Sequence, residues 1–464
     1  MSTSVVRNLA LVVVTWAAIY LPWLGTPELR SEEGHRVLPA VEMLESGDYI
    51  VPHVGGQPYL AKPPFVNWKI AAAFRLTGIR NEWTARLVSA VHVLAAAVVI
   101  ATVGRGLLGS GAWVAAIAWL TNLGMIEKGR MIEIDAIYVS LFAIAFVCWL
   151  VLWDRRGSRW LTWTVPWLFL GFGLLAKGPA HLIFFYALVI AILWRTKKLR
   201  DLVHPAHAIG LVLMVTIFAA WAVPCFRAIS GASISQTWKY ELVLRLTGGE
   251  NAATDWPMNF PRGFGYLLPW LLVLPFIRIA NVAPERRHIA TGLALGAAVP
   301  FVVVLLLPGT IPRYILPTLV PVCLLIGLAV RDNAFNWRIG SITAPARAVW
   351  ALVAFFVAVS GIIFAARSAT TLKNAPKVRP IAERVNAVVP STEPLFAVTP
   401  LFQPYLFYVH SPVRYVNSVD QLPPQARFFI TGPTERPKVD SSKAELLFDT
   451  PEYRGHSTAL FRMK

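Results

Sequence analysis

The stretch "SEEGHRVLPAVEMLESGDYIVPHVGGQPYLAKPP" at residues 31–64 follows directly on an apolar run at residues 5–25. It concentrates carboxylates in a chain that is 56% hydrophobic and only 15% charged. Soluble globular domains are roughly 45–50% apolar and about 25% charged, so this composition predicts helices embedded in lipid. We therefore interpret residues 31–64 as the first loop outside the membrane, and we expect this loop to carry chemistry.

The net charge of +18 and a pI near 10.1 do not indicate nucleic-acid binding. The basic residues lie in short loops between apolar runs, which favours contact with a lipid bilayer. Cys148, Cys225 and Cys323 all lie inside apolar runs, so neither a disulfide framework nor a zinc site is predicted. The run at residues 5–25 lacks a small-residue cleavage site and is expected to be a retained span.

About eleven apolar runs are long enough to be transmembrane helices, which need about 20 residues and at least about 17. The predicted spans are residues 5–25, 84–104, 108–126, 132–153, 160–176, 179–194, 206–226, 264–281, 288–307, 313–330 and 346–367. The sequence thus predicts an α-helical polytopic membrane protein.

The loops between these spans separate by charge. If the N-terminus is cytoplasmic, every cluster of Lys and Arg falls on the cytoplasmic side, as the positive-inside rule requires. These clusters are Arg105; Arg155, Arg156 and Arg159; Arg195, Lys197, Lys198 and Arg200; Arg278, Arg286 and Arg287; and Arg331, Arg338 and Arg347. An odd number of spans then places the C-terminus outside, on the side that holds most carboxylates of the membrane part.

The composition changes at Ser368. The runs "EPLFAVTP", "VRYVNSV" and "ARFFITGP" have the pattern of short strands, and "PKVRPIAERVNAVV" has helical spacing. Residues 369–464 are therefore expected to form a small extracytoplasmic α/β domain. Residues 1–368 would form the transmembrane catalytic domain, with interfacial helices in its first outer loop at about residues 26–80.

The first loop is predicted to contain two short helices. One would start at Ser31 as its N-cap, with Val37, Leu38, Val41 and Leu44 as an apolar stripe along the membrane surface. The second would follow the Pro-Pro pair in "LAKPPFVNWKIAAAFRLTG". Glu32 and Glu33 then lie at a membrane edge, where partial desolvation would raise their proton affinity for general-base work. The alternative is that both only place charge at the helix start.

The segments "SEEGHRVLPAVEMLESGDYIVP" and "GGQPYLAKPPFVNW" resemble the first outer loop of polyprenyl-phosphate-dependent glycosyltransferases of the GT-C fold. The resemblance is to aminoarabinose and galacturonic acid transferases of lipid A and, more distantly, to protein O-mannosyltransferases. In that family an Asp-Glu pair opens the loop, where this chain has Glu32 and Glu33. The family's following Arg-Tyr is His35-Arg36 here, and a frequent Glu before the family's lysine is Ala61.

Four further segments resemble the family in the same order: "RMIEIDAIYVSLFAIA", "GLLAKGPAHL", "ELVLRLTGG" and "TIPRYILPTLVP". In the last one Thr310 replaces the family's lysine, and Arg313 can substitute for it. Together these segments cover most of residues 5–330.

The resemblance implies an inverting glycosyltransferase of the plasma (inner) membrane. It would move a sugar from a polyprenyl-phosphate donor to an extracytoplasmic acceptor, chiefly a glycolipid such as lipid A or lipopolysaccharide core. The catalytic candidates are Glu32, Glu33 and Asp135. The candidates for binding the donor phosphate are Lys62, Lys177, Arg245 and Arg313. The candidates for other substrate contacts are His35, Arg36, Tyr59, Glu241 and Tyr314.

Each assignment has a structural alternative. Lys62 and Lys177 can reach the interface as snorkelling side chains, Asp135 can cap a helix, and Arg245 can be an ordinary loop charge. Whether a divalent cation takes part is open, because His35 and its neighbours show no metal-ligand spacing. A protein O-glycosyltransferase and a non-enzymatic lipid or sugar transporter remain as other functions, although the chain shows no internal repeat of the transporter kind.

Overall fold

The computed structural model describes most of the chain, in two compact units. Unit 1 comprises Met1–Leu24, Ala61–Phe65 and Arg86–Ala366, and unit 2 comprises Gly25–Leu60, Val66–Ala85 and Arg367–Lys464. The described residues are 3–30, 32–229, 236–240, 243, 247, 256–307, 309–339, 342–343, 347, 350–355, 357–359, 362, 378–453 and 455–464.

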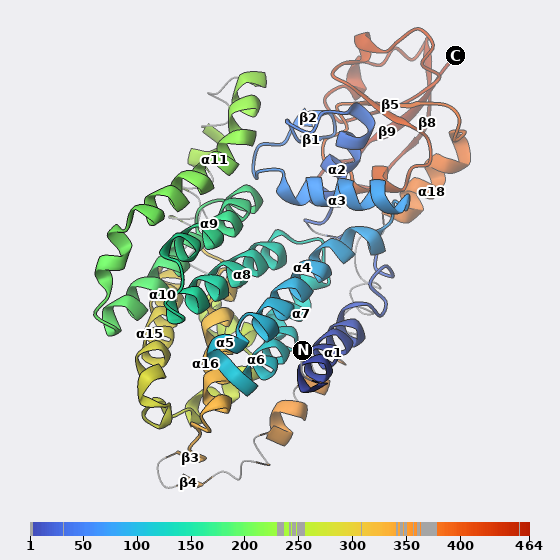
Figure 1. Ribbon diagram of the computed structural model, residues 1–464. Helices are drawn as coiled ribbons and strands as arrows, with labels where there is room; N and C mark the ends of the chain where they lie inside the picture. Colours follow the sequence, from blue (N-terminus) through green and yellow to red (C-terminus); the bar gives the residue numbers. More distant parts are fainter. Residues whose placement is uncertain are drawn as a thin grey trace. The chain divides into compact units, whose positions relative to one another are not determined.

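Unit 1 is built from helices (Figure 1). Its α-helices are α1 (Thr3–Tyr20), α4 (Glu82–Thr102, which begins in unit 2), α5 (Arg105–Leu108), α6 (Ala112–Leu120), α7 (Leu123–Gly129), α8 (Ile134–Asp154), α9 (Arg159–Ala176), α10 (His181–Arg195), α11 (Pro205–Ala228), α14 (Asn259–Tyr266), α15 (Pro284–Leu306) and α16 (Leu319–Arg331). Shorter elements are the 3₁₀ turns η1 (Gly109–Gly111), η2 (Leu199–Val203), η3 (Trp256–Met258) and η7 (Pro312–Thr318), and the strands β3 (Arg338–Ile339) and β4 (Ile342–Thr343).

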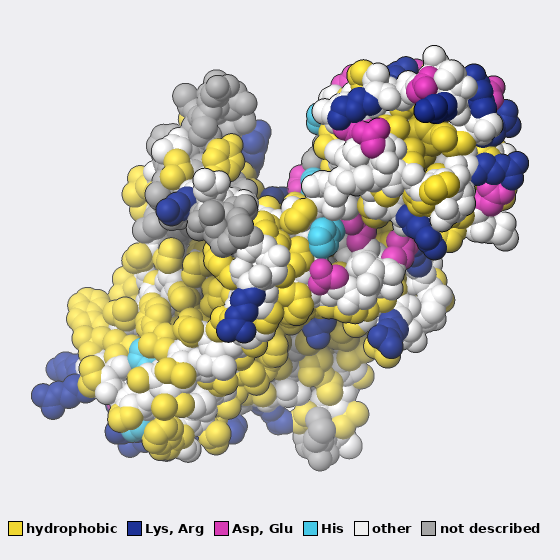
Figure 2. All heavy atoms as spheres, turned by 90° about the horizontal axis from the view of Figure 1, so that it is seen from above, with side chains coloured by type: hydrophobic (Ala, Val, Ile, Leu, Met, Phe, Trp, Pro, Cys, Tyr) yellow, Lys and Arg dark blue, Asp and Glu magenta, His cyan; other side chains and the backbone are white. Residues whose placement is uncertain are grey.

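Several described helices are long and apolar enough to cross a membrane. They are Glu82–Thr102, Ile134–Asp154, Pro205–Ala228 and Pro312–Arg331, and the bent pair Arg105–Leu120 with Leu123–Gly129 is a further candidate. Large apolar side chains of α11, such as Val212 and Val215, are more than half exposed, which suits a lipid-facing helix. Figure 2 shows hydrophobic side chains over much of the face that it draws. The predicted multi-pass membrane protein is thus confirmed, while the total of about eleven spans stays a prediction.

The expected span at residues 264–281 is wrong. Helix α14 ends at Tyr266, and the 3₁₀ turns η4 (Trp270–Leu272), η5 (Leu274–Phe276) and η6 (Ile279–Asn281) follow it. Pro269 and Pro275 account for the break, because a proline inside a helix removes a backbone hydrogen bond and clashes with the preceding turn. Apolar composition alone overestimated the length of this element.

Both predicted helices of the first loop are confirmed in unit 2, as α2 (Gly34–Ser46) and α3 (Phe65–Thr77), with the hairpin β1 (His53–Val54) and β2 (Gln57–Pro58) between them. The N-cap of α2 is Glu33 rather than Ser31, which lies outside the described residues. In the apolar stripe of α2, Val37, Leu38 and Val41 are buried and Leu44 is partly buried, and the helix packs toward β1 and the turn η8 (Pro404–Tyr408). The expectation that this stripe lies on the membrane surface is therefore wrong, because protein covers it.

The predicted C-terminal α/β fold is also confirmed. Helix α18 (Arg379–Val388) accompanies a five-stranded sheet in the order β6–β5–β7–β9–β8. Its strands are β5 (Leu395–Val398), β6 (Val413–Val416), β7 (Phe428–Thr431), β8 (Ala444–Asp449) and β9 (Ala459–Met463), and the 3₁₀ turns η9 (Val419–Gln421) and η10 (Arg436–Lys438) lie between them. Strand β5 is parallel to β6 and β7, whereas β9 is antiparallel to β7 and β8. Strands β5 and β7 are buried along their whole length, which explains their unbroken apolar sequences.

Candidate active site

Charged side chains from α7, α8, α9 and η7 meet within unit 1. Asp135 lies in the first turn of α8, and Lys177 directly follows the last residue of α9. The helix dipole favours a carboxylate at the first of these positions and a cation at the second. Because a short loop joins α8 to α9 and the two helices pack together, Lys177 returns to the end of α8 that holds Asp135.

Asp135 is the centre of this cluster. Lys177 Nζ donates a hydrogen bond to Asp135 Oδ1, and Arg313 Nε lies 3.2 Å from Asp135 Oδ2. The ring of Tyr314 lies beneath Lys177, with 4.2 Å between Nζ and the ring centroid. Both oxygens of a carboxylate that is almost fully buried are thus occupied by cations. The structure brings together four residues that the sequence singled out separately.

Three charged residues that the sequence analysis did not select extend the cluster. Lys128 Nζ lies 3.1 Å from Glu127 Oε1 and 3.6 Å from Glu133 Oε1, and Arg313 Nη1 lies 3.5 Å from the same Glu133 oxygen. The six residues therefore hold three carboxylates and three cations. All three additional residues belong to "EKGRMIEID", a charged segment between two apolar runs. The charge of this segment, set against its apolar neighbours, could have identified them as candidates.

The remaining phosphate-binding candidates are Lys62 and Arg245. Lys62 Nζ donates to the backbone carbonyl of Ala61 at 2.9 Å. Arg245 and Glu241, a predicted substrate contact, lie outside the described residues. Within the described ranges, no group of three or more His, Cys, Asp or Glu side chains could hold a metal ion.

A second group of predicted residues meets in unit 2, at the start of α2. Glu33 is buried, and its Oε2 accepts a hydrogen bond from the Arg30 backbone N–H at 3.1 Å. The Glu32 side chain is 36% exposed, and its Oε2 lies 3.1 Å from His35 Nδ1. Glu32 is therefore the accessible carboxylate of the pair, whereas the buried Glu33 carboxylate binds the backbone just before α2.

The predicted substrate contacts of the first loop also lie together. Arg36 Nη1 donates to the Tyr59 hydroxyl at 3.1 Å. The rings of His35 and Tyr59 stack, with 5.4 Å between their centroids. The start of α2 and the residue after β2 thus form one polar and aromatic surface within unit 2.

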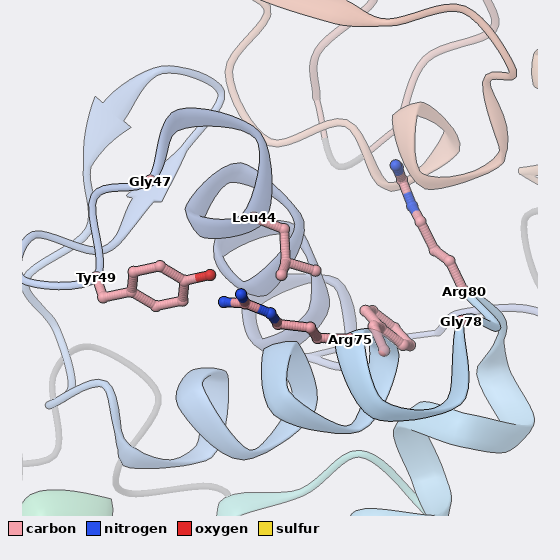
Figure 3. A pocket seen from close by; sticks show the side chains of 7 residues that line it. Leu44, Gly47, Tyr49, Arg75, Gly78 and Arg80 are labelled. Carbon is pink, nitrogen blue, oxygen red and sulfur yellow. The ribbon is translucent and has the colours of Figure 1, made fainter.

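Unit 2 also contains an open pocket of about 510 Å³. Its lining residues are Leu44, Gly47, Tyr49, Phe74, Arg75, Gly78 and Arg80. In Figure 3 the Tyr49 hydroxyl and the Arg75 guanidinium point toward each other, whereas Arg80 points away. Arg80 is paired with Glu45, with 3.1 Å between Nη1 and Oε1. The chemistry of the Tyr49–Arg75 side suits an anionic or hydroxylated group.

Comparisons with known proteins agree with the resemblance noted in the sequence. A family model described as dolichyl-phosphate-mannose-protein mannosyltransferase matches residues 61–223. An undecaprenyl phosphate-alpha-4-amino-4-deoxy-L-arabinose arabinosyl transferase 2 of Pseudomonas fluorescens is 28% identical over 309 residues, which cover 63% of this chain and 54% of that protein. A transferase 1 from another strain of that species is 26% identical over 339 residues, which cover 70% of this chain and 60% of that protein. The chain thus spans between about half and two thirds of these relatives' length.

Among solved structures, the crystal structure of ArnT from Cupriavidus metallidurans bound to undecaprenyl phosphate superimposes with a TM-score of 0.72. The two chains are 17% identical, and the match covers 98% of this chain and 97% of that one. This likeness confirms the expected fold, which is the GT-C fold with a small C-terminal α/β domain.

Proposed function

We propose that this protein is an inverting glycosyltransferase of the inner membrane. It moves a sugar from a polyprenyl-phosphate donor to an extracytoplasmic glycolipid such as lipid A or lipopolysaccharide core. One observation carries the proposal: cations gather around Asp135 in a chain with the fold of an enzyme crystallised with undecaprenyl phosphate. The names of the curated relatives, which are undecaprenyl-phosphate arabinosyl transferases, support the same reaction class.

The cation cluster is suited to a donor phosphate. Lys and Arg form charge-assisted hydrogen bonds with phosphate oxygens, and Lys128, Lys177 and Arg313 supply three such groups. Because Asp135 and Glu133 already pair with these cations, the donor phosphate competes with carboxylates for them. The carboxylates hold the cations in place before the donor binds, and they pair with them again when the phosphate leaves.

The proposed base is Glu32. Its carboxylate takes the proton from an acceptor hydroxyl, or from an acceptor phosphate, while that oxygen attacks the anomeric carbon. The bond between the anomeric carbon and the phosphate oxygen breaks, and its electron pair leaves on the phosphate. Direct displacement inverts the anomeric carbon. Glu33 holds the start of α2, Lys62 and Arg245 are further phosphate ligands, and His35, Arg36, Tyr59, Glu241 and Tyr314 are substrate contacts.

One alternative acceptor is favoured by a specific observation. The family model that matches residues 61–223 describes protein mannosyltransferases, so a protein hydroxyl can take the place of the glycolipid. A transporter, in contrast, would leave the sugar–phosphate bond of the donor intact. Offering both acceptors to the protein with a labelled donor separates these three functions.

The test uses the full chain in lipid vesicles, a labelled polyprenyl-phosphate pentose and lipid A. Glu32→Gln keeps the side-chain shape but cannot accept a proton, so turnover should fall by about 10²–10⁴-fold, the usual contribution of a general base. Glu33→Gln is the matched control and should lose less. Glu32→Asp retains a carboxylate and should keep measurable activity. Wild-type turnover by Glu32→Gln would contradict the assignment of the base, and an absence of labelled product with every acceptor would contradict the transferase.

A further inference from the structure

We propose that the C-terminal domain is part of the catalytic apparatus, with Phe402 as the residue that positions the His35–Glu32 pair. The inference rests on the proposed role of Glu32 as the base. It gives a function to a segment of the C-terminal domain and to His35, which stands where the resembling family has an arginine.

The His35 imidazole stacks with two aromatic rings within unit 2. Its ring stacks on Phe402 with 3.7 Å between the centroids and 8° between the planes. Tyr59 stacks with the same imidazole at 5.4 Å and 24°. His35 Nδ1 lies 3.1 Å from Oε2 of Glu32, which stands three residues earlier, just before α2 begins. The orientation of the proposed base is therefore coupled to an aromatic ring that lies 370 residues further along the chain.

Gly34 shows how closely Phe402 approaches. A Cβ atom added at Gly34 would lie 2.7 Å from Cζ of the Phe402 ring, a distance that real Cβ contacts do not show. Any other residue at position 34 would push the ring away from α2. The glycine between Glu33 and His35 is thus explained by the ring that occupies the space of its side chain.

The backbone that carries Phe402 is held in an unusual conformation. Thr399 and Leu401 have φ angles of 43° and 60°, in the left-handed region that disfavours residues with a Cβ. A residue in this conformation is energetically unfavourable and persists only where surrounding contacts enforce it. Such strain is common at functional positions, and here it directs the segment after β5 toward the first loop.

Three further contacts fix the same loop to the C-terminal domain. A Cβ at Gly55 would lie 2.5 Å from the Leu401 carbonyl oxygen, and a Cβ at Gly56 would lie 2.5 Å from Cβ of Tyr415. Gln57 Nε2 donates to Asn417 Oδ1 at 2.9 Å. The hairpin β1–β2 and the start of α2 are therefore docked by neighbouring parts of one domain, which makes that domain a scaffold for the acidic loop.

The chemical consequence is orientation of the base. A carboxylate that accepts a proton must lie within hydrogen-bond reach of the acceptor hydroxyl, and a small displacement of such a group can cost about 10²-fold in rate. The stacked imidazole restricts the rotamers of Glu32 by fixing the position of its partner Nδ1. Phe402 is thus a positioning residue that acts through His35, without touching substrate.

The test compares Phe402→Ala, His35→Ala and the double variant in the full-length protein. We expect each single variant to lower kcat by about 10- to 100-fold with little change in KM for the donor. The double variant should be no worse than either single one, because both break the same connection. Phe402→Tyr keeps the aromatic ring, so its turnover should stay close to that of the wild type. Phe448→Ala, which removes a half-buried ring on strand β8, is the matched control and should match wild type.

Hydrogen exchange gives a measurement that does not depend on activity. Phe402→Ala should speed exchange of the amides in the first turns of α2, whereas Phe448→Ala should not. Wild-type kcat in Phe402→Ala, or fully additive losses in the double variant, would overturn the inference. Unchanged hydrogen exchange in α2 of Phe402→Ala would overturn the positioning role of Phe402. Wild-type activity of Glu32→Gln would instead overturn the proposed base, so the two failures can be told apart.

Discussion

Glu42 is a buried carboxylate in unit 2 that organises the β1–β2 turn. Its Oε1 accepts from the Gly55 N–H at 2.8 Å, and its Oε2 accepts from the Gly56 N–H at 3.1 Å. Both glycines have positive φ angles, of 63° and 74°, which the turn requires and which other residues rarely adopt. Burial raises the pKa of Glu42 from 4.5 to about 7, although the two N–H groups and the Tyr415 hydroxyl oppose this shift.

This raised pKa predicts that stability falls as the pH rises. Between pH 4.5 and about 7 the folded protein binds the Glu42 proton more tightly than the unfolded chain does, so the stabilisation present at low pH is lost through this window. Glu42→Gln stays neutral at every pH and should therefore reduce the dependence of stability on pH. Glu383→Gln, on the exposed surface of α18, should leave that pH dependence unchanged. Heat unfolding in detergent from pH 4 to 8 measures the slope, and equal slopes for wild type and Glu42→Gln would contradict the prediction.

Asp135 is the residue on which the cation cluster depends. Asp135→Asn leaves Lys177 and Arg313 partly buried without their shared counter-ion, and breaking a buried pair in this way typically costs about 3–5 kcal/mol. We expect lower stability and lower turnover.

Adding Lys177→Met to Asp135→Asn should recover stability but not turnover, since Lys177 is a proposed phosphate ligand. Asp449→Asn, in the exposed pair with Arg436, should change stability by less than about 1 kcal/mol. Recovery of both properties in the double variant would argue against phosphate binding by Lys177.

Individual residues were predictable where a short segment resembles a motif of a known family. Asp135, Lys177 and Arg313 were selected through that resemblance, and they meet in the structure. Phe402 and Glu42 could not be selected in the same way. An aromatic residue in a β-rich tail is most often core, and the partners of both residues lie in segments whose approach no local pattern indicates.

At the scale of the elements, close helix contacts in unit 1 occur at glycines. A Cβ at Gly210 on α11 would lie 2.1 Å from the Trp163 carbonyl oxygen of α9. A Cβ at Gly111 would lie 1.9 Å from the carbonyl oxygen of Gly327 on α16. Small residues let helix backbones approach in lipid, where van der Waals packing replaces the hydrophobic effect as a driving force. These glycines therefore determine which helices are neighbours.

Gly210→Ala should separate α9 from α11. The added methyl group has no space between the two backbones, and overpacking of this kind costs about 1–3 kcal/mol. Gly265→Ala is the matched control, because nothing lies within 4 Å of the added Cβ there. Heat unfolding in detergent should show a lower midpoint for Gly210→Ala alone. Equal midpoints for the two variants would contradict the close contact.

Some elements were predictable from the sequence alone, whereas others differ from the predicted span: the run at residues 108–126 has no proline, yet it is divided between α6 and α7. Helix α8, expected at residues 132–153, is found at Ile134–Asp154. The run at residues 264–281 is just as apolar, but Pro269 and Pro275 divide it into short turns. The stripe on α2 was correctly predicted to be apolar, but amphipathic spacing cannot tell whether lipid or another part of the chain covers it.

At the scale of the whole molecule, the two ends of the α8–α9 pair differ in charge. Asp135 and Lys177 lie at one end. At the other end, Lys198 Nζ lies 5.0 Å from the centroid of the Trp153 ring, and Asp154 interacts electrostatically with several cations. These cations are Arg155, Lys198, Arg286 and Arg331. They come from four loops that the sequence analysis assigned to the cytoplasm, so residues far apart in the chain form one basic face.

This basic face predicts the orientation of the chain. Clusters of Lys and Arg stay on the cytoplasmic side during insertion, so the loop between α8 and α9 should be cytoplasmic and the end of α8 that holds Asp135 should face outside. With an odd number of spans, the C-terminal domain then lies outside with the proposed active site. A reporter that fluoresces only in the cytoplasm should be bright when inserted after Gly157 and silent when fused after Lys464. Fluorescence at Lys464 would contradict the odd number of spans, and silence at Gly157 would reverse the orientation, because that loop carries part of the basic face.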